Sequence, residues 1–304
     1  MTRTQRIAVV AALVLAASFA LAARLPIAFK TITAFTDEPL PAFEARDPID
    51  IASIVRAIPD RGVAGTADTV YAAHPAQRYQ RSVVEGYGNC SNLVKGLSWG
   101  LLRDHHEFEI VYMLPAETFL EGRGHTILRA KLALPEGPRV GLVDVAAAAI
   151  PRVAGRVLDV ADLGGAVPAV DLDPLRPESE DWAPFYDAAL LADVVIGRTS
   201  SAETARWYRF VDAIYLDLGL PEKFDKIVYV GIGVVVGVFP AIHVGDLAAL
   251  RSRHPFEFAE MNAALWGMRI APVILLGCAL SWLVAGRRRR SGKAEWREFA
   301  GVEY

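Results

Sequence analysis

Three apolar segments dominate the sequence, at residues 7–23, 227–245 and 264–286. They raise the mean hydropathy of the 304-residue chain to +0.28, and 53% of its residues are hydrophobic against 22% charged. A composition this apolar excludes intrinsic disorder. Between the first two segments lie about 200 residues of ordinary globular composition, enough for one domain with its own core. We therefore expect a membrane-attached chain that carries one large domain outside the bilayer.

The first segment is predicted to be a signal anchor or transmembrane helix within residues 1–24. Basic residues in MTRTQR precede an apolar run that directs export of the chain after it. The run is near the lower limit for spanning a bilayer, and Ala20-Leu21-Ala22 resembles a signal-peptidase site, so a cleaved signal peptide is the alternative.

The third segment is predicted to be a transmembrane helix over residues 264–286. Trp266 and Trp282 occupy positions typical of interfacial anchors. The basic tail at 287–304 begins with four consecutive arginines, a pattern typical of a cytoplasmic flank.

The second segment, 226–247, makes the topology ambiguous. If this hydrophobic segment also crosses the membrane, the two basic ends of the chain lie on opposite sides. The alternatives are two crossings with this segment in the interface, three crossings with the arginines outside, or a cytoplasmic domain, which raw Lys/Arg counting favours. We expect the main domain outside the cytoplasm, because the first segment is an export signal and long domains translocate largely regardless of charge.

Charge and cysteine content exclude several classes of protein. The net charge of −3 gives no indication of a nucleic-acid partner. Cys278 lies in an apolar segment, so a disulfide with Cys90, the other cysteine, is not expected. The sequence has no zinc-ligand spacing, dinucleotide fingerprint or P-loop, and we expect neither a metal nor a cofactor.

The main domain is predicted over residues 66–200, after a linker at 25–65 that contains a short helix near 49–58. Within it we expect helical pieces at 76–103 that break at Gly86-Tyr87-Gly88, followed by three strands. The strands are predicted at 108–114, 125–134 and 139–145, and Pro135-Glu136-Gly137-Pro138 joins the last two as a hairpin. The Pro-rich stretch 151–200 favours loops, and Ser200 and Ser201 cap an amphipathic helix within 200–225.

Cys90, His125 and Asp144 form the pattern that carries chemistry. Cys90 begins a predicted helix, where free backbone N–H groups and the helix dipole stabilise a thiolate or an oxyanion. His125 opens one strand of the hairpin and Asp144 closes the other, so both lie toward one end of it. The pattern is that of a nucleophile, a base and a residue that orients the base. Asn89 and Tyr87 are candidate oxyanion donors, with simple turn residues as the alternative.

Tyr87-Gly88-Asn89-Cys90-Ser91, with His125 and Asp144, resembles the transglutaminase-like superfamily of membrane-anchored bacterial type. The resemblance covers about residues 70–150. It implies a papain-like α+β fold in which the cysteine-bearing helix packs on an antiparallel sheet. It also implies that Cys90 is the nucleophile, His125 the general base and acid, and Asp144 its orienter. Thr126-Ile127-Leu128 depart from the family, whose bacterial members often have an aromatic residue after the histidine.

Two functions are consistent with these observations. The first is a membrane-anchored cysteine acyl-transfer enzyme of the cell envelope, which hydrolyses or transamidates a peptide or other amide substrate. The alternative is a catalytically inactive scaffold or assembly protein. Its partners are membrane lipid and a membrane protein, and the Gly233-x-x-x-Gly237 spacing permits close helix packing.

Overall fold

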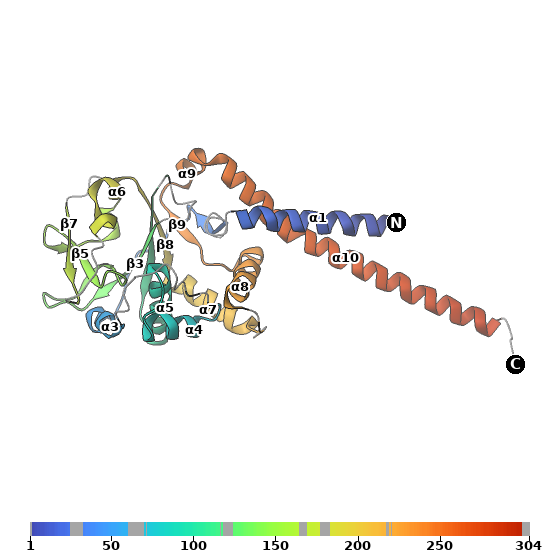
Figure 1. Cartoon of the computed structure of the whole chain (residues 1–304), viewed down its shortest axis with the longest axis horizontal. Helices are drawn as coiled ribbons and strands as arrows, with labels where there is room; N and C mark the ends of the chain where they lie inside the picture. The colour runs from blue at the N-terminus through green and yellow to red at the C-terminus, as the bar shows by residue number, and fades with distance from the viewer. Residues whose placement is uncertain are drawn as a thin grey trace. The chain divides into compact units, whose positions relative to one another are not determined.

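The computed structural model describes residues 2–24, 33–59, 70, 72–115, 117, 124–163, 169–176, 183–216, 219 and 221–299. The chain divides into two compact units. Unit 1 comprises Met1–Phe29 and Pro255–Tyr304, and unit 2 comprises Lys30–His254. The protein is an α+β protein with a mixed sheet and an apolar helix at each terminus (Figure 1).

Unit 1 consists of helices α1 (Arg3–Arg24) and α10 (Pro255–Phe299). Among the described residues, the segments Arg3–Leu21 and Pro255–Ala285 are long and apolar enough to cross a membrane. Most of their side chains are exposed, whereas a core helix of this composition would be buried. This pattern is the one expected of helices that face lipid.

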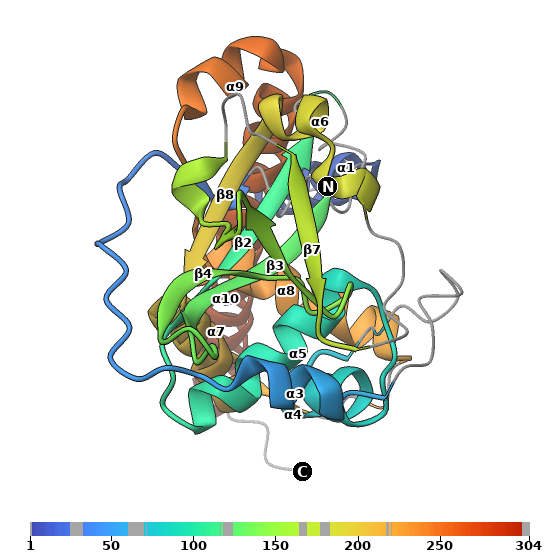
Figure 2. The same ribbon diagram turned by 90° about the vertical axis from the view of Figure 1, so that its left-hand side faces the viewer.

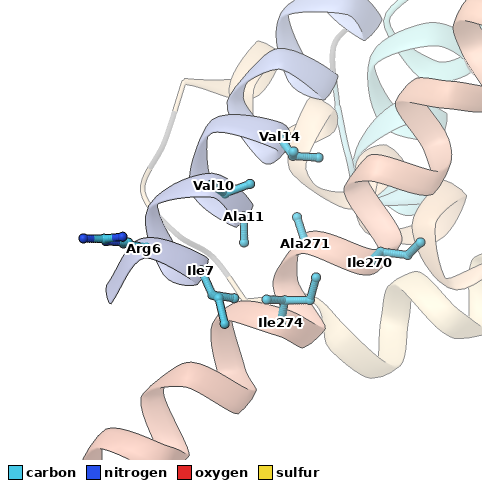
Figure 3. Close-up of a pocket in the computed structure, with 8 residues that line it drawn as sticks. All are labelled: Arg6, Ile7, Val10, Ala11, Val14, Ile270, Ala271 and Ile274. Carbon is cyan, nitrogen blue, oxygen red and sulfur yellow. The ribbon is translucent and has the colours of Figure 1, made fainter. Parts of the chain in front are cut away.

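The two helices pack against each other in opposite directions. Gly267 of α10 lies against Ser18, and a Cβ atom at this glycine would overlap the Ser18 hydroxyl. Toward the start of α1, Ile7 instead lies near Ile274 (Figure 3). Small residues at the crossing allow this close approach. Beyond it the helices border an apolar groove of about 290 Å³, lined by Arg6, Ile7, Val10, Ala11, Val14, Ile270, Ala271 and Ile274.

Unit 2 is organised around a six-stranded sheet with the order β1-β9-β8-β2-β3-β4. Neighbouring strands are antiparallel, except that β1 and β9 are parallel. The strands are β1 (Phe35–Thr36), β2 (Phe108–Pro115), β3 (His125–Leu132), β4 (Arg139–Val143), β8 (Val194–Ser200) and β9 (Ile242–Val244). As the sequence predicts, β3 and β4 form a hairpin, with Leu132 opposite Arg139.

A second, three-stranded sheet has the order β6-β5-β7. Its strands are β5 (Ala149–Val153), β6 (Arg156–Val157) and β7 (Val170–Pro174). The helices of unit 2 are α3 (Ile51–Ala57), α4 (Pro75–Tyr79), the π-helical turn η1 (Gln80–Val84), α5 (Cys90–Arg103), α6 (Ala188–Ala192), α7 (Ser201–Ile214), α8 (Glu222–Val236) and α9 (Leu247–Arg253). Short 3-10 turns occur at η3 (Val160–Asp162) and η4 (Ala183–Tyr186).

Both faces of the central strands are buried. On one face, Phe108 and Leu128 pack with Leu97 of α5 in the larger core, which residues of α3 also join. Figure 2 shows α3 next to α5. On the other face, Val111 and Ile127 pack with residues that come after β4 in the chain. Strands that are covered on both sides have nearly continuous apolar sequences. This explains why FEIVYML in β2 does not alternate between apolar and polar residues.

The apolar segment 226–247 does not form one continuous helix across the membrane. Helix α8 ends at Val236, where Gly237 adopts a left-handed conformation with φ of 83°. The chain then enters the sheet as β9. Its His243 donates a hydrogen bond from Nδ1 to the Glu38 carbonyl, and Nε2 lies 2.9 Å from Oε1 of Glu203. Some apolar residues of this segment, among them Val234, Ile242 and Val244, are therefore buried in unit 2, whereas Ile227 and Val236 of α8 are exposed.

Other sequence predictions also differ from the structure. The stretch 151–200, predicted as loops, contains strands of both sheets, including β8 next to β2. In the predicted linker, Ile51 and Val55 of α3 are fully buried in the core, while 25–32 and 60–65 lie outside the described residues. Ser200 caps α7 as predicted, but that helix ends at Ile214.

Candidate active site

Cys90 is the first residue of α5. Asn89 caps this helix, because its side-chain oxygen accepts a hydrogen bond from the Asn92 backbone N–H at 3.1 Å. Gly88 has a φ of 103°, and a Cβ there would lie 2.7 Å from Asn92 Cβ, so the turn before the helix requires glycine. The apolar face of α5 is anchored in the core, which holds the partly buried thiol at a fixed helix N-terminus.

His125 is the first residue of β3, opposite Met113 of β2. Its side chain is fully buried, and its Nε2 lies 2.5 Å from Oδ2 of Asp144. Asp144 comes directly after β4 and forms an isolated antiparallel bridge with Ala149. The hairpin therefore brings the two residues together, as the sequence predicts.

Four donors hold the Asp144 carboxylate in place. Oδ1 accepts hydrogen bonds from the backbone N–H groups of Ala146 and Ala147, each at 3.0 Å. Oδ2 accepts the hydroxyl of Tyr186 at 2.8 Å in addition to the His125 contact. These hydrogen bonds fix the carboxylate, and the carboxylate in turn fixes the orientation of the ring that it contacts.

Two aromatic residues that the sequence pattern does not single out complete the site. The Phe185 ring stacks on the His125 imidazole, with ring centroids 4.7 Å apart and an interplanar angle of 27°. Tyr186 approaches the same imidazole edge-on, at 6.3 Å. Burial and the Asp144 charge raise the pKa of the Tyr186 hydroxyl, so it remains a hydrogen-bond donor. The only sequence signal is an aromatic pair in an otherwise polar, Pro-rich stretch.

The thiol and the imidazole influence each other's ionisation. Burial opposes the thiolate, but the hydrogen bond and charge of His125, with a backbone hydrogen bond from Thr126, lower the pKa of Cys90. Burial also opposes a charged imidazole, yet the charge and hydrogen bond of Asp144, with the contact to Cys90, raise the pKa of His125 to about 10. The site therefore favours a thiolate–imidazolium pair over two neutral groups.

The candidate oxyanion donors, Asn89 and Tyr87, lie in the turn that leads into α5. The side-chain oxygen of Asn89 is used as the helix cap. The Tyr87 backbone N–H donates to the Arg81 carbonyl at 2.9 Å, within the turn. The N-terminal backbone N–H groups of α5 are the donors nearest in sequence to the Cys90 thiol. Within the described part of the chain, no group of three His, Cys, Asp or Glu residues is arranged to hold a metal ion.

The fold and the site together define an α+β protein with two terminal apolar helices and a candidate site formed by Cys90, His125 and Asp144. No family model matches the chain, and neither the curated proteins nor the solved structures contain a match.

Proposed function

We propose that this protein is a membrane-anchored cysteine acyl-transfer enzyme of the transglutaminase-like type, which hydrolyses or transamidates a peptide or other amide at the cell envelope. The observation that carries the proposal is a buried His125 held at Nε2 by Asp144, together with a thiol at the N-terminus of α5 whose pKa this histidine lowers. The buried aspartate fixes the ring, and the contribution of His125 lowers the pKa of Cys90, which favours the thiolate.

Each step of the proposed reaction uses Cys90, His125 or the N-terminus of α5. The Cys90 thiolate attacks the amide carbonyl carbon, and the helix N–H groups stabilise the oxyanion. His125 gives its proton to the nitrogen of the leaving amine as the C–N bond breaks, which leaves a thioester. Water or a second amine then attacks the thioester carbonyl while His125 takes up its proton. The C–S bond then breaks and Cys90 leaves as a thiolate, which releases the product and regenerates the thiolate–imidazolium pair.

The test compares single variants for their ability to replace the wild-type gene in a deletion strain. Cys90→Ala and His125→Ala are expected to lose function at wild-type protein levels, whereas Cys278→Ala, which removes the other thiol, retains it. An iodoacetamide adduct on Cys90, mapped by mass spectrometry, is expected in the wild type. Full function of Cys90→Ala would instead favour the scaffold or assembly role.

We also propose that unit 2 lies outside the cytoplasm. Since α1 and α10 run in opposite directions, the end with Arg3 and Arg6 also carries the Arg287–Arg290 end of α10. The opposite end of the pair carries residues 24 and 255, and unit 2 is joined to the pair through both. Two crossings with both basic ends in the cytoplasm satisfy the positive-inside rule without conflict.

This topology predicts the sidedness of Cys90. In a Cys278→Ala background, a membrane-impermeant thiol reagent is expected to label Cys90 in cells whose outer barrier is permeabilised but whose inner membrane is intact. Breaking that membrane is expected to increase the label less than twofold. A cysteine introduced at Ser291, beyond the arginines, should show the reverse pattern. Labelling of Cys90 only after lysis would place unit 2 in the cytoplasm.

A further inference from the structure

The exposed apolar side chains of unit 2 are concentrated in one region. Within the described residues of this unit, the large hydrophobic side chains that are exposed are Val84, Leu216, Phe224, Ile227, Ile232 and Val236. All but Val84 belong to α8 or to the connection before it. Such a concentration on one surface marks an interaction site, whereas single exposed apolar residues need no explanation.

Helix α8 has two different faces. Phe224, Ile227, Ile232 and Val236 are each at least 40% exposed, and Gly231 lies between them with open space where a Cβ would be. On the opposite face, Gly233 packs directly against the Trp207 ring of α7. Tyr229 is buried on that side, and its hydroxyl bonds to the Leu216 backbone. The helix is therefore fixed to unit 2 by one face while its other apolar face is uncovered within that unit.

The covalent arrangement of the chain indicates what covers this face. The remaining exposed large hydrophobic side chains of the described chain lie on α1 and α10, the helices of membrane-spanning length. Unit 2 is joined to these helices at both ends, and His254 directly precedes the first residue of α10. A short length of chain therefore joins α8 to these helices, and in a bilayer that contains them it keeps α8 near the membrane surface.

We propose that α8 lies flat on the membrane, with the face formed by Phe224, Ile227, Ile232 and Val236 in the boundary between lipid headgroups and acyl chains. Helices that bind in this way bury the apolar face by about 5–10 Å and carry basic residues that attract anionic headgroups. The first turns of α8 hold Lys223 and Lys226 together with Glu222 and Asp225, so the proposed contact depends on the apolar face and not on charge. This contact limits how unit 2 is oriented over the bilayer, and it is independent of catalysis at Cys90.

The test uses the full-length protein in liposomes of phosphatidylcholine and phosphatidylglycerol, with a photoreactive amino acid introduced at one position at a time. Positions 227 and 232 of α8 are compared with Val273, an exposed residue of α10, and with Arg139, an exposed residue of the β3–β4 hairpin. After illumination, phospholipid adducts are quantified by mass spectrometry. If α8 lies in the interface, we expect the amount of lipid adduct at 227 and 232 to be within about threefold of the amount at 273. It should also be at least about tenfold above the amount at 139.

Other outcomes overturn the proposal in distinguishable ways. Lipid adducts at 273 but only the level of 139 at both α8 positions would show that the helices are inserted and α8 is not on the bilayer. Crosslinks from 227 and 232 to a second copy or to another segment of this chain would assign the face to protein packing. Absence of adducts at 273 as well would remove the membrane attachment on which the proposal rests, without bearing on the chemistry of Cys90.

Discussion

Replacement of Asp144 by asparagine is expected to slow alkylation of Cys90 at pH 6 by about 10- to 100-fold, with little change above pH 9. Each unit by which the pKa of a thiol rises reduces its thiolate fraction about tenfold at pH values below that pKa. The lower intrinsic nucleophilicity of a low-pKa thiolate offsets part of this difference in alkylation rate.

The geometry around the carboxylate explains why so small a change has so large an effect. The backbone N–H groups of Ala146 and Ala147 both donate to Oδ1. In the variant they fix the amide oxygen at that position, and the amide nitrogen then faces Nε2 of His125. Nε2 must become an acceptor, so the ring proton moves to the nitrogen that faces Cys90, and the imidazole no longer accepts a proton from the thiol.

The pH dependence has a definite sign. Because the pKa of Cys90 is lowered and that of His125 is raised, the thiolate–imidazolium pair exists between the two values. The wild-type alkylation rate should therefore be nearly constant at pH values between the two pKa values and fall when the pH drops through the lowered thiol pKa. In Asp144→Asn the rate should instead rise steadily toward the ordinary thiol pKa of about 8.5.

The measurement is the rate of iodoacetamide modification of Cys90 between pH 5 and 10, in a Cys278→Ala background. Asp173→Asn is the matched control, since this exposed carboxylate pairs with Arg152 on the surface and does not contact the site. Thermal denaturation should be recorded for both variants to exclude unfolding. Superimposable pH profiles for the wild type and Asp144→Asn would contradict the proposed role of the aspartate.

The local parts of the site could be predicted from the sequence. A Gly-Tyr-Gly-Asn turn before an apolar helix fixes where α5 begins, and the short Pro-Glu-Gly-Pro connection fixes the pairing of β3 with β4. These signals lie within a few residues of the side chains that they position. These signals are sufficient to predict that Cys90 begins α5 and that His125 and Asp144 lie together.

The contacts that depend on distant segments could not be predicted. Phe185 and Tyr186 reach His125 and Asp144 from a 3-10 turn about 40 residues beyond Asp144, and nothing in that turn specifies its partner. The prediction for segment 226–247 stayed open between a membrane span and an interfacial segment for another reason. Hydropathy measures the transfer of side chains out of water and does not distinguish a bilayer from a buried sheet, so β9 resembled part of a membrane span.

Two glycines on different faces of α8 are expected to respond in opposite ways to alanine. Gly233→Ala should lower the free energy of unfolding of unit 2 by about 2–3 kcal/mol, because the new Cβ overlaps the Trp207 ring. Gly231→Ala should be neutral or raise it by up to about 1 kcal/mol, since alanine favours the helix and its Cβ meets open space.

The overlap at Gly233 cannot be relieved cheaply. Trp207 is buried between the Phe210 and Phe239 rings, with centroid distances of 5.6 and 5.2 Å, so a shift of its ring disturbs both neighbours. Moving α8 instead would strain the turn after it, where the backbone N–H groups of Gly237, Val238 and Phe239 all donate to the Gly233 carbonyl. The cost therefore falls on packing between α7, α8 and the segment that leads into β9.

Thermal denaturation of the detergent-solubilised full-length protein, followed by tryptophan fluorescence, measures both variants under one condition. For a domain of this size, 2–3 kcal/mol corresponds to a decrease in Tm of about 4–12 °C. Equal losses in both variants would mean that α8 tolerates no added methyl group on either face, and that the face containing Gly231 is covered. Equal stability in both would mean that α8 does not pack on Trp207. Opposite effects agree with a helix held to unit 2 through the face that contains Gly233, which leaves its other face available to lipid.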